Sequence, residues 1–152
     1  MKKYITLLVL AFVLIISCEK DDICLENTTP NLMLKFYDFE NDTLIKTIKI
    51  DSIRVLNKGL ISNYTAKSFD SILIPLDVNQ YTTSYQITSE NTSDTIYFSY
   101  DRNDVFVSRS CGYNTNFENL TIDSTTNNWI KAYNINTTII DNDTTAHINI
   151  YH

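Results

Sequence analysis

The sequence is poor in the residues on which most catalytic, metal-binding and phosphate-binding motifs depend. Its 152 residues include only two glycines, two histidines and one tryptophan. It contains no Gly-rich phosphate loop, no His-Glu-x-x-His element and no Gly-x-Ser-x-Gly element. Because no acid, base and nucleophile converge in any motif, we expect a protein that is not an enzyme, with no catalytic residues, no metal and no cofactor.

The two histidines do not suggest a shared site. His147 and His152 are five residues apart on a predicted strand, so they point to opposite faces, and each is expected to be a surface residue. The acidic stretches 101–104 and 141–143 contain oxygens that Ca²⁺ accepts as ligands. Turns in which Asn and Asp bond to their own backbone explain both stretches more simply.

The chain also lacks a long apolar run and a cluster of positive charge. Its longest apolar run, residues 7–16, has about half of the roughly 20 residues that a bilayer-spanning helix needs. With Lys2 and Lys3 before it and Ser17 after it, the run predicts a signal peptide over residues 1–17. Loss of the two lysines takes the net charge from −6 to −8, which argues against nucleic acid and against direct adhesion to anionic membrane.

Cys18 directly follows the predicted signal peptide. The segment Ile15-Ile16-Ser17-Cys18 resembles a bacterial lipobox, in which the cysteine becomes the mature N-terminus and carries acyl chains. Each buried CH₂ group contributes about 0.8 kcal/mol, so several chains together hold a protein firmly in a membrane. The alternative is an ordinary cleaved signal with a chance cysteine nearby.

The four charged residues after the predicted lipidation site suggest where the protein is displayed. Glu19, Lys20, Asp21 and Asp22 resemble the surface-export signal of Bacteroidetes-type lipoproteins, in which any residue, a lysine and two acids follow the anchor cysteine. We therefore expect a lipid anchor in the outer membrane with the protein exposed at the cell surface. The alternative is a merely solvated tether on a protein that faces the periplasm.

The remaining chain has the composition of a β-rich domain. With only Gly59 and Gly112 available, turns must be made mainly by Asn and Asp, and the abundant Ile, Tyr and Thr favour strands. Short candidate strands recur about every ten residues, with turn signals between them and no long helical periodicity. We predict a tether at residues 18–30 and one antiparallel β-sandwich at 31–152, immunoglobulin-like or a similar Greek key, with about seven to nine short strands.

Some segments give sharper structural predictions. Residues 95–100 and 105–109 are expected to form a hairpin whose turn is 101–104. A change in alternation predicts a bulge near Asp51-Ser52, and the polar residues 62–68 predict a loop. Further candidate strands are residues 32–39, 44–56, 71–76, 84–89, 117–122, 129–135 and 146–151.

Cys24 and Cys111 are the only cysteines beyond the lipidation site. An even pair in an exported chain predicts a disulfide, which would also attach the tether to the domain. It would close a loop of about 87 residues, worth roughly 4–5 kcal/mol in the chain-entropy description. Two independent buried thiols are the alternative.

Ten tyrosines and Trp129 suggest a carbohydrate-binding surface, because aromatic faces stack on sugar rings. Tyr and Trp are also routine core and edge residues of β-sandwiches, so the aromatic content alone does not decide between these interpretations.

A short pattern that resembles the O-glycosylation acceptor of Bacteroidetes envelope proteins recurs six times: Asp, then Ser or Thr, then an apolar residue or Thr. Three of the six hydroxyl residues lie in predicted exposed turns, where a bulky glycan is tolerated: Thr43, Ser124 and Thr144. The same triplet arises without sugar wherever an Asp ends a turn and a β-branched residue begins a strand.

Four segments resemble a family of small Bacteroidetes lipoproteins known only as a domain of unknown function: residues 18–24, 70–76, 106–113 and 146–152. The resemblance implies a lipidated, exported β domain without an assigned activity, accompanied by an outer-membrane barrel protein. We therefore expect a non-enzymatic accessory lipoprotein that contacts a barrel or another envelope protein through a sandwich face or edge strand. A surface carbohydrate-binding module is the alternative.

Overall fold

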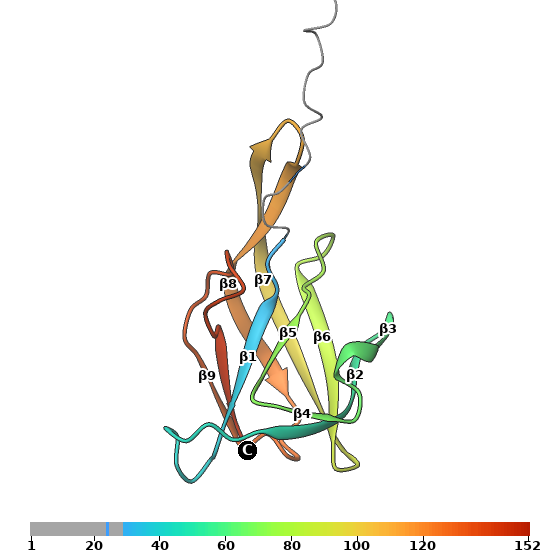
Figure 1. The fold of residues 1–152 in the computed structure, drawn as a ribbon, viewed down its shortest axis with the longest axis vertical. Coiled ribbons are helices and arrows are strands. Elements are labelled where there is room, and N and C mark those ends of the chain that lie inside the picture. Colours follow the sequence, from blue (N-terminus) through green and yellow to red (C-terminus); the bar gives the residue numbers. More distant parts are fainter. Residues whose placement is uncertain (1–23, 25–28) are drawn as a thin grey trace, which may run out of the picture.

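Two β-sheets pack face to face around one apolar core (Figure 1). They are seen in a computed structural model that describes Cys24 and residues 29–152. The predicted signal peptide, Cys18 and the export signal at residues 19–22 lie outside the described residues. The described part of the chain contains ten strands and no α-helix, so the predicted all-β sandwich is confirmed.

The smaller sheet has four strands in the order β5-β1-β10-β9. Its strands are β1 (Leu32–Tyr37), β5 (Ser71–Ile74), β9 (Ala132–Ile135) and β10 (Ile148–Tyr151). Strands β1 and β10 pair in parallel at the centre, whereas the two outer pairs are antiparallel. The two ends of the domain therefore lie side by side in the middle of this sheet.

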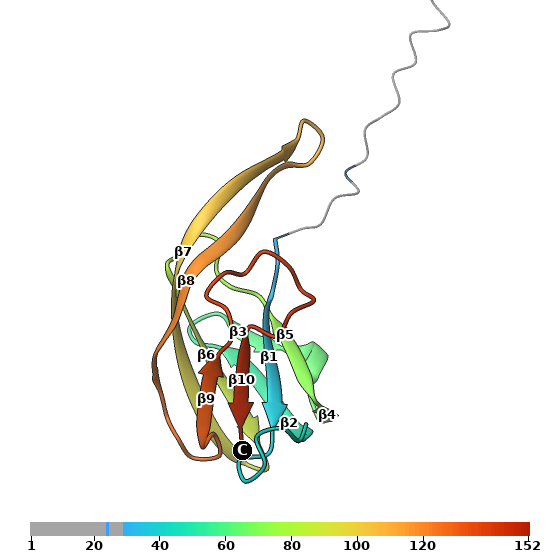
Figure 2. The same cartoon turned by 90° about the vertical axis from the view of Figure 1, so that its left-hand side faces the viewer.

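The larger sheet is antiparallel, in the order β3-β2-β6-β7-β8, and β4 also pairs with β2. Its strands are β2 (Ile48–Val55), β3 (Gly59–Ile61), β4 (Lys67–Phe69), β6 (Thr82–Ser89), β7 (Thr92–Ser108) and β8 (Gly112–Thr125). Strands β7 and β8 are much longer than the others and extend together beyond the sandwich as a curved arm (Figure 2).

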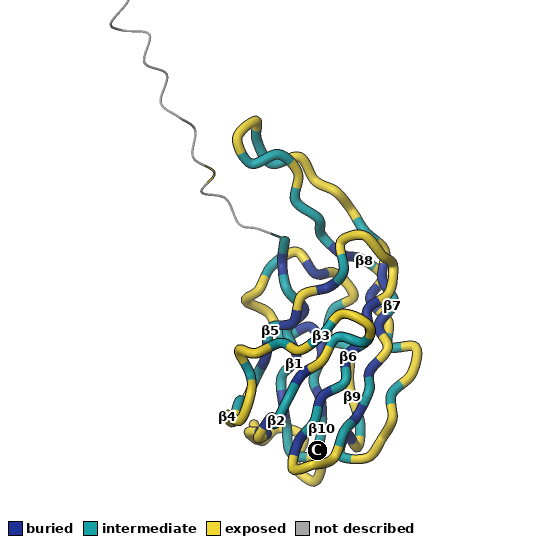
Figure 3. The backbone as a smooth tube through the Cα atoms, turned by 90° about the vertical axis from the view of Figure 1, so that its right-hand side faces the viewer, coloured by how far each residue is buried: buried dark blue, intermediate teal, exposed yellow. Residues whose placement is uncertain are grey.

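Alternation of apolar residues along the strands creates the core between the sheets (Figure 3). In β1 every second residue is fully buried, and β6 buries Tyr85 and Ile87 from the opposite sheet. In β10, Ile148 and Ile150 point inward as their spacing predicts.

Polar residues shape the turns and irregularities of the larger sheet. The register between β2 and β6 shifts between Ile50 and Ser52, which confirms the predicted bulge. Asn57, Asn91 and Asn119 all have positive φ, so asparagine takes the role that glycine has in most chains.

The predicted hairpin with its turn at residues 101–104 was wrong. These four polar residues lie inside the continuous strand β7, whose hairpin partner is β8, and the turn lies between Ser108 and Gly112. The stretch is beyond the sandwich, where neither face of the strand meets the core. Polar residues are therefore tolerated on both faces, and the sequence resembles a turn.

The predicted loop at residues 62–68 is also partly wrong. It begins with a 3₁₀ turn, η1 (Ser62–Tyr64), and its last residues belong to β4. The Tyr64 hydroxyl donates a hydrogen bond to the carbonyl of Leu73 (2.7 Å) and accepts one from its N–H (3.0 Å). This side chain thus satisfies backbone groups at the edge of β5, where the sheet has no further strand.

Candidate functional site

The arm is formed by residues 101–116, where β7 and β8 pair beyond the rest of the sheet (Figure 2). Strand β6 reaches only as far as the pair Thr82–Ser99, so the following part of β7 has no β6 neighbour. The register between β7 and β8 shifts between Ser99 and Asp101, and Asn119 opposite has φ of 53°. Such a bulge increases local twist, which explains why the arm curves away from the body.

The base of the arm is fixed in the core. Tyr100 and Phe117 are buried with ring centroids 5.0 Å apart. The Tyr100 hydroxyl accepts a hydrogen bond from the N–H of Asp77 (2.9 Å). Next to it, the Arg102 guanidinium donates to the carbonyl of Val78 and lies 5.1 Å from the centroid of the Tyr81 ring. The arm therefore starts from an ordered junction.

The tip of the arm is joined covalently to the N-terminal segment. Cys24 and Cys111 form a disulfide with their Cα atoms 4.9 Å apart, which confirms the predicted bridge. Gly112 next to it has φ of 72°, as a tight turn at this point requires. Closer to the body, the N–H of Thr115 donates to Thr29 Oγ1 (3.3 Å). Cys24 is thus attached to the tip of the arm, and Thr29 contacts the middle of the arm.

The arm tip, residues 105–113, carries exposed apolar side chains. Phe106 is 57% exposed, Tyr113 opposite it is 72% exposed, and Val105 is 41% exposed. The two aromatic rings are in edge-to-face contact at 5.4 Å. The sequence analysis missed this surface, although three consecutive apolar residues at 105–107 place apolar groups on both faces of a strand, which a half-buried strand does not need.

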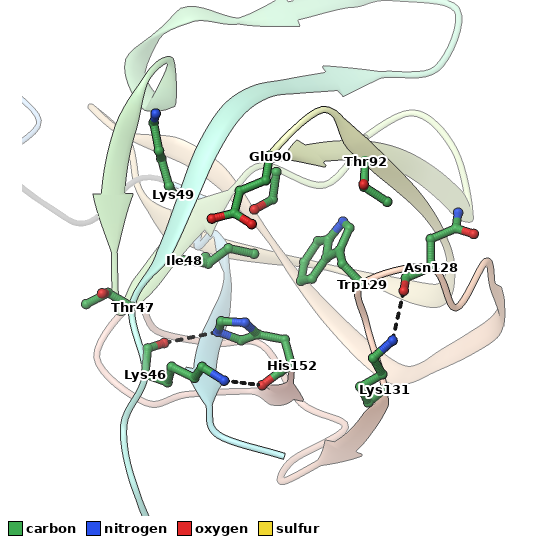
Figure 4. A pocket seen from close by; sticks show the side chains of 11 residues that line it. Lys46, Thr47, Ile48, Lys49, Glu90, Thr92, Asn128, Trp129, Lys131 and His152 are labelled. Atoms are coloured by element: carbon green, nitrogen blue, oxygen red, sulfur yellow. Dashed lines mark hydrogen bonds between the residues drawn. The ribbon is translucent and has the colours of Figure 1, made fainter. Parts of the chain in front are cut away.

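A second feature is a cavity of about 480 Å³ at the end of the sandwich opposite the arm, around Trp129 (Figure 4). The indole lies in the middle of it, with its ring centroid 6.5 Å from that of Phe36 and 6.1 Å from that of His152. Its Nε1–H donates to the carbonyl of Ile87 (3.2 Å). The ring is thus partly a core residue and partly a wall of the cavity.

Three lysines line this cavity although the chain as a whole is acidic. The Lys46 ammonium lies 2.7 Å from a carboxylate oxygen of Asp38, and Lys131 donates to the carbonyl of Asn128 (2.9 Å). Within the described part of the chain, Lys49 is in no ion pair. Glu90 is the one acidic side chain among the lining residues, so the side chains of the cavity have a positive balance.

A buried carboxylate holds the loop that carries Trp129. Asp94 is fully buried, and its two oxygens accept four hydrogen bonds of 2.8 Å, from Thr126 Oγ1 and from three consecutive backbone N–H groups of Asn128, Trp129 and Ile130. Charged acceptors are stable in the interior only when they are saturated in this way. Sequence analysis missed Asp94 because this residue also fits the turn-and-strand pattern of its triplet.

The interpretation of His147 as a surface residue was wrong. Its side chain is completely buried, and Nδ1 accepts a hydrogen bond from the N–H of Met33 (2.9 Å). Burial lowers the pKa of His147, while the nearby Asp141 and Asp143 carboxylates act in the opposite direction. Burial also lowers the pKa of His152, which lies at the cavity on the other end. The two histidines therefore lie at opposite ends of β10 and do not form one site.

The three glycosylation candidates are exposed, but they differ in their surroundings. Thr43 and Thr144 lie in turns, and each hydroxyl donates to the side-chain oxygen of the Asn two residues earlier (2.8 Å). Ser124 was predicted in a turn and instead lies in β8, paired with Tyr97. The strand continues through it because β8 stays paired with β7 as far as the pair Ile96–Thr125.

The acidic stretches do not assemble with other ligands. Residues 101–104 belong to a strand, and 141–143 form a turn in which Asn142 caps the following backbone. No group of three His, Cys, Asp or Glu side chains is close enough to hold a metal within the described residues. The same residues contain no helix of the length and apolarity that a membrane span requires.

Comparison with known proteins gives one match. A family model described as "Family of unknown function (DUF6452)" matches residues 43–152, which include the arm and all the residues that line the cavity. No curated protein and no solved structure matches the chain.

Proposed function

We propose that this chain, which belongs to the family of unknown function described above, is a non-enzymatic accessory lipoprotein of the outer membrane that binds another envelope protein. Its anchor would be the acylated Cys18, and the residues 19–22 would direct it to the cell surface. Display on the periplasmic face is the alternative arrangement.

The observation that carries the proposal is the disulfide between Cys24 and Cys111. Disulfides persist in exported proteins and are rare in the cytosol, where thiols are kept reduced. The bridge supports export, and it also joins the arm to the segment that follows the proposed lipid anchor. If Cys18 is acylated, the bridge keeps the β7–β8 arm close to the lipid anchor.

The arm supplies a surface for a protein partner. Beyond Tyr100, whose N–H donates to the carbonyl of Tyr81, the outer edge of β7 has no neighbouring strand among the described residues, so its backbone is a template for an added strand. A two-stranded ribbon is marginally stable alone, whereas a third strand from a partner would stabilise it. An envelope protein with an accessible edge strand fits this surface.

Photo-crosslinking in intact cells tests the partner. A photo-reactive residue in place of the exposed Asn103 on the arm should capture one dominant envelope protein. The same residue in place of Leu44, which is exposed in a loop on the body, is the matched control and should capture far less. An arm probe that gives no more product than the control would contradict the proposal.

The cavity around Trp129 favours a second candidate, a module that binds acidic carbohydrate. An aromatic wall suits a sugar ring, and Lys49 and Lys131 suit its carboxylates or sulfates. On a glycan array, the protein should retain acidic glycans, and Lys49→Ala with Lys131→Ala should remove the signal. Lys67→Ala, which changes an exposed lysine on β4, should not. Equal retention by all variants, or none by the parent, would contradict this candidate.

A further inference from the structure

We infer that the arm tip rests on the lipid surface in which the anchor is embedded, with Phe106 and Tyr113 at the level of the headgroups. This inference rests on the proposed acylation of Cys18. It adds an orientation that acylation alone does not specify, because it puts the arm against the bilayer and the Trp129 cavity at the far end.

The covalent structure limits how far the tip can be from the anchor. Cys24 is six positions after Cys18, and a fully extended chain of that length spans at most about 21 Å. Because Cys24 is bonded to Cys111, this limit applies to the arm tip. Without the bridge, the first of the described residues to contact the domain would be Thr29, eleven residues after Cys18 and up to about 38 Å away.

The chemistry of the tip suits a bilayer interface. Phe106 and Tyr113 are both more than half exposed, and aromatic side chains with an apolar body are favoured at the boundary between headgroups and hydrocarbon. Arg109 is the only charged residue in 105–113, so no carboxylate at the tip is repelled by lipid phosphates. The acidic body gives no electrostatic attraction, and the anchor instead supplies the proximity.

A purely structural role for the aromatic pair leads to a different expectation. Cross-strand aromatic pairs stabilise hairpins by about 0.2–1 kcal/mol without any lipid, and both rings would then remain in water. A protein that covers the tip is the other competing occupant. In vesicles of pure lipid, the rings enter an apolar environment only if the tip rests on the bilayer. They stay in water if their role is purely structural or if a protein normally covers the tip.

The test uses tryptophan fluorescence of the acylated protein in phosphatidylethanolamine–phosphatidylcholine vesicles whose lipids carry bromine on the acyl chains. Phe106→Trp places a probe at the tip, and Tyr133→Trp places one on β9 in the body, where the tyrosine is also exposed. The emission of Trp129 in the parent protein is subtracted. We expect a blue shift and loss of about half of the added emission for Phe106→Trp, and neither change for Tyr133→Trp.

Three further outcomes complete the test. Acylated protein whose Phe106→Trp emission is unquenched, or quenched only after envelope proteins are added, overturns the inference and leaves the anchor intact. A mass without acyl chains overturns both. Replacing Cys24 and Cys111 by serine in the acylated Phe106→Trp protein should reduce the quenching, and unchanged quenching would show that the bridge does not position the tip.

Discussion

Burial determines the chemistry of His147 at the scale of a single residue. Its Nδ1 accepts a hydrogen bond from the N–H of Met33, so the neutral ring carries its proton on Nε2. Burial lowers the pKa of His147 in the folded state, whereas the unfolded chain binds a proton near pH 6.5. Below about pH 6.5 the unfolded state therefore binds more protons, and acidification destabilises the fold.

We predict that the free energy of unfolding falls as the pH is lowered from about 7 towards 5. Each histidine contributes at most about 1.4 kcal/mol to this loss per pH unit. His147→Asn keeps an oxygen acceptor for Met33 and removes the titration, so its stability should depend less on pH. His152→Asn should also reduce the pH dependence, because burial lowers the pKa of His152 in the same direction. Urea unfolding at several pH values measures this, and identical slopes for parent and His147→Asn would contradict it.

The two ion-paired carboxylates act in a different pH range. The hydrogen bonds from Lys46 and Lys58 lower the pKa of Asp38 and of Asp77, respectively. Their contribution is present above the ordinary pKa of 3.8 and is lost as the pH falls through the lower, folded-state value. A loss of stability between pH 7 and 5 therefore does not come from these groups.

Asp94 is the residue whose replacement should disturb the Trp129 loop most. The amide of Asp94→Asn has one acceptor oxygen, so part of the four hydrogen bonds to residues 126–130 would be lost. We expect a loss of about 2–4 kcal/mol in unfolding free energy and a red shift of Trp129 emission. Asp123→Asn, at an exposed carboxylate that accepts from Ser99, should cost less than about 0.5 kcal/mol. Equal losses in both variants would contradict this.

The arm depends on the disulfide at the scale of an element. It is a two-stranded ribbon with no core behind it, which is marginally stable by itself. Reduction should therefore increase amide hydrogen exchange in residues 101–108 and 112–116, while the amides of β6 stay protected. Unchanged exchange in the arm after reduction, verified by alkylation of both cysteines, would show that the ribbon is stable without the bridge.

Sequence patterns predicted the strands that bury one face and missed the one that does not. Strands β1, β6 and β10 alternate buried and more exposed residues, because one face of each meets the core. Strand β7 loses this alternation after Tyr100, where it leaves the body. The stretch 101–104 then has the composition of a turn, and only pairing with β8 determines that it is extended.

Two of the glycosylation candidates share a local structure. Thr43 and Thr144 each end an Asn-Asp-Thr turn whose Asn accepts a hydrogen bond from the Thr hydroxyl. If Thr144 carries a glycan, Thr144→Ala will lower the mass of the native protein by the glycan mass, and Thr145→Ala will not. A difference equal to the amino-acid change alone would contradict modification at this turn.

At the scale of the whole molecule, the site could be predicted only in parts. Two cysteines beyond the predicted lipidation site, Cys18, were enough to predict the bridge between Cys24 and Cys111. That the bridge lies at the tip of an arm depends on the long register of β7 and β8, which no local pattern contains. The cavity likewise combines residues 46–49, Trp129 and His152, which only the packing of two sheets brings together.

We propose that a lipid on Cys18 holds the domain to a membrane, and that the arm tip is bonded to the tether through Cys24 and Cys111. The intact mass of the protein extracted from its native envelope tests this most directly. We expect the mass of the polypeptide 18–152, two hydrogens lighter for one disulfide, plus the mass of attached acyl chains and of any glycan that Thr144→Ala removes. A chain that retains residues 1–17, or one that begins at Cys18 without acyl mass, would contradict it.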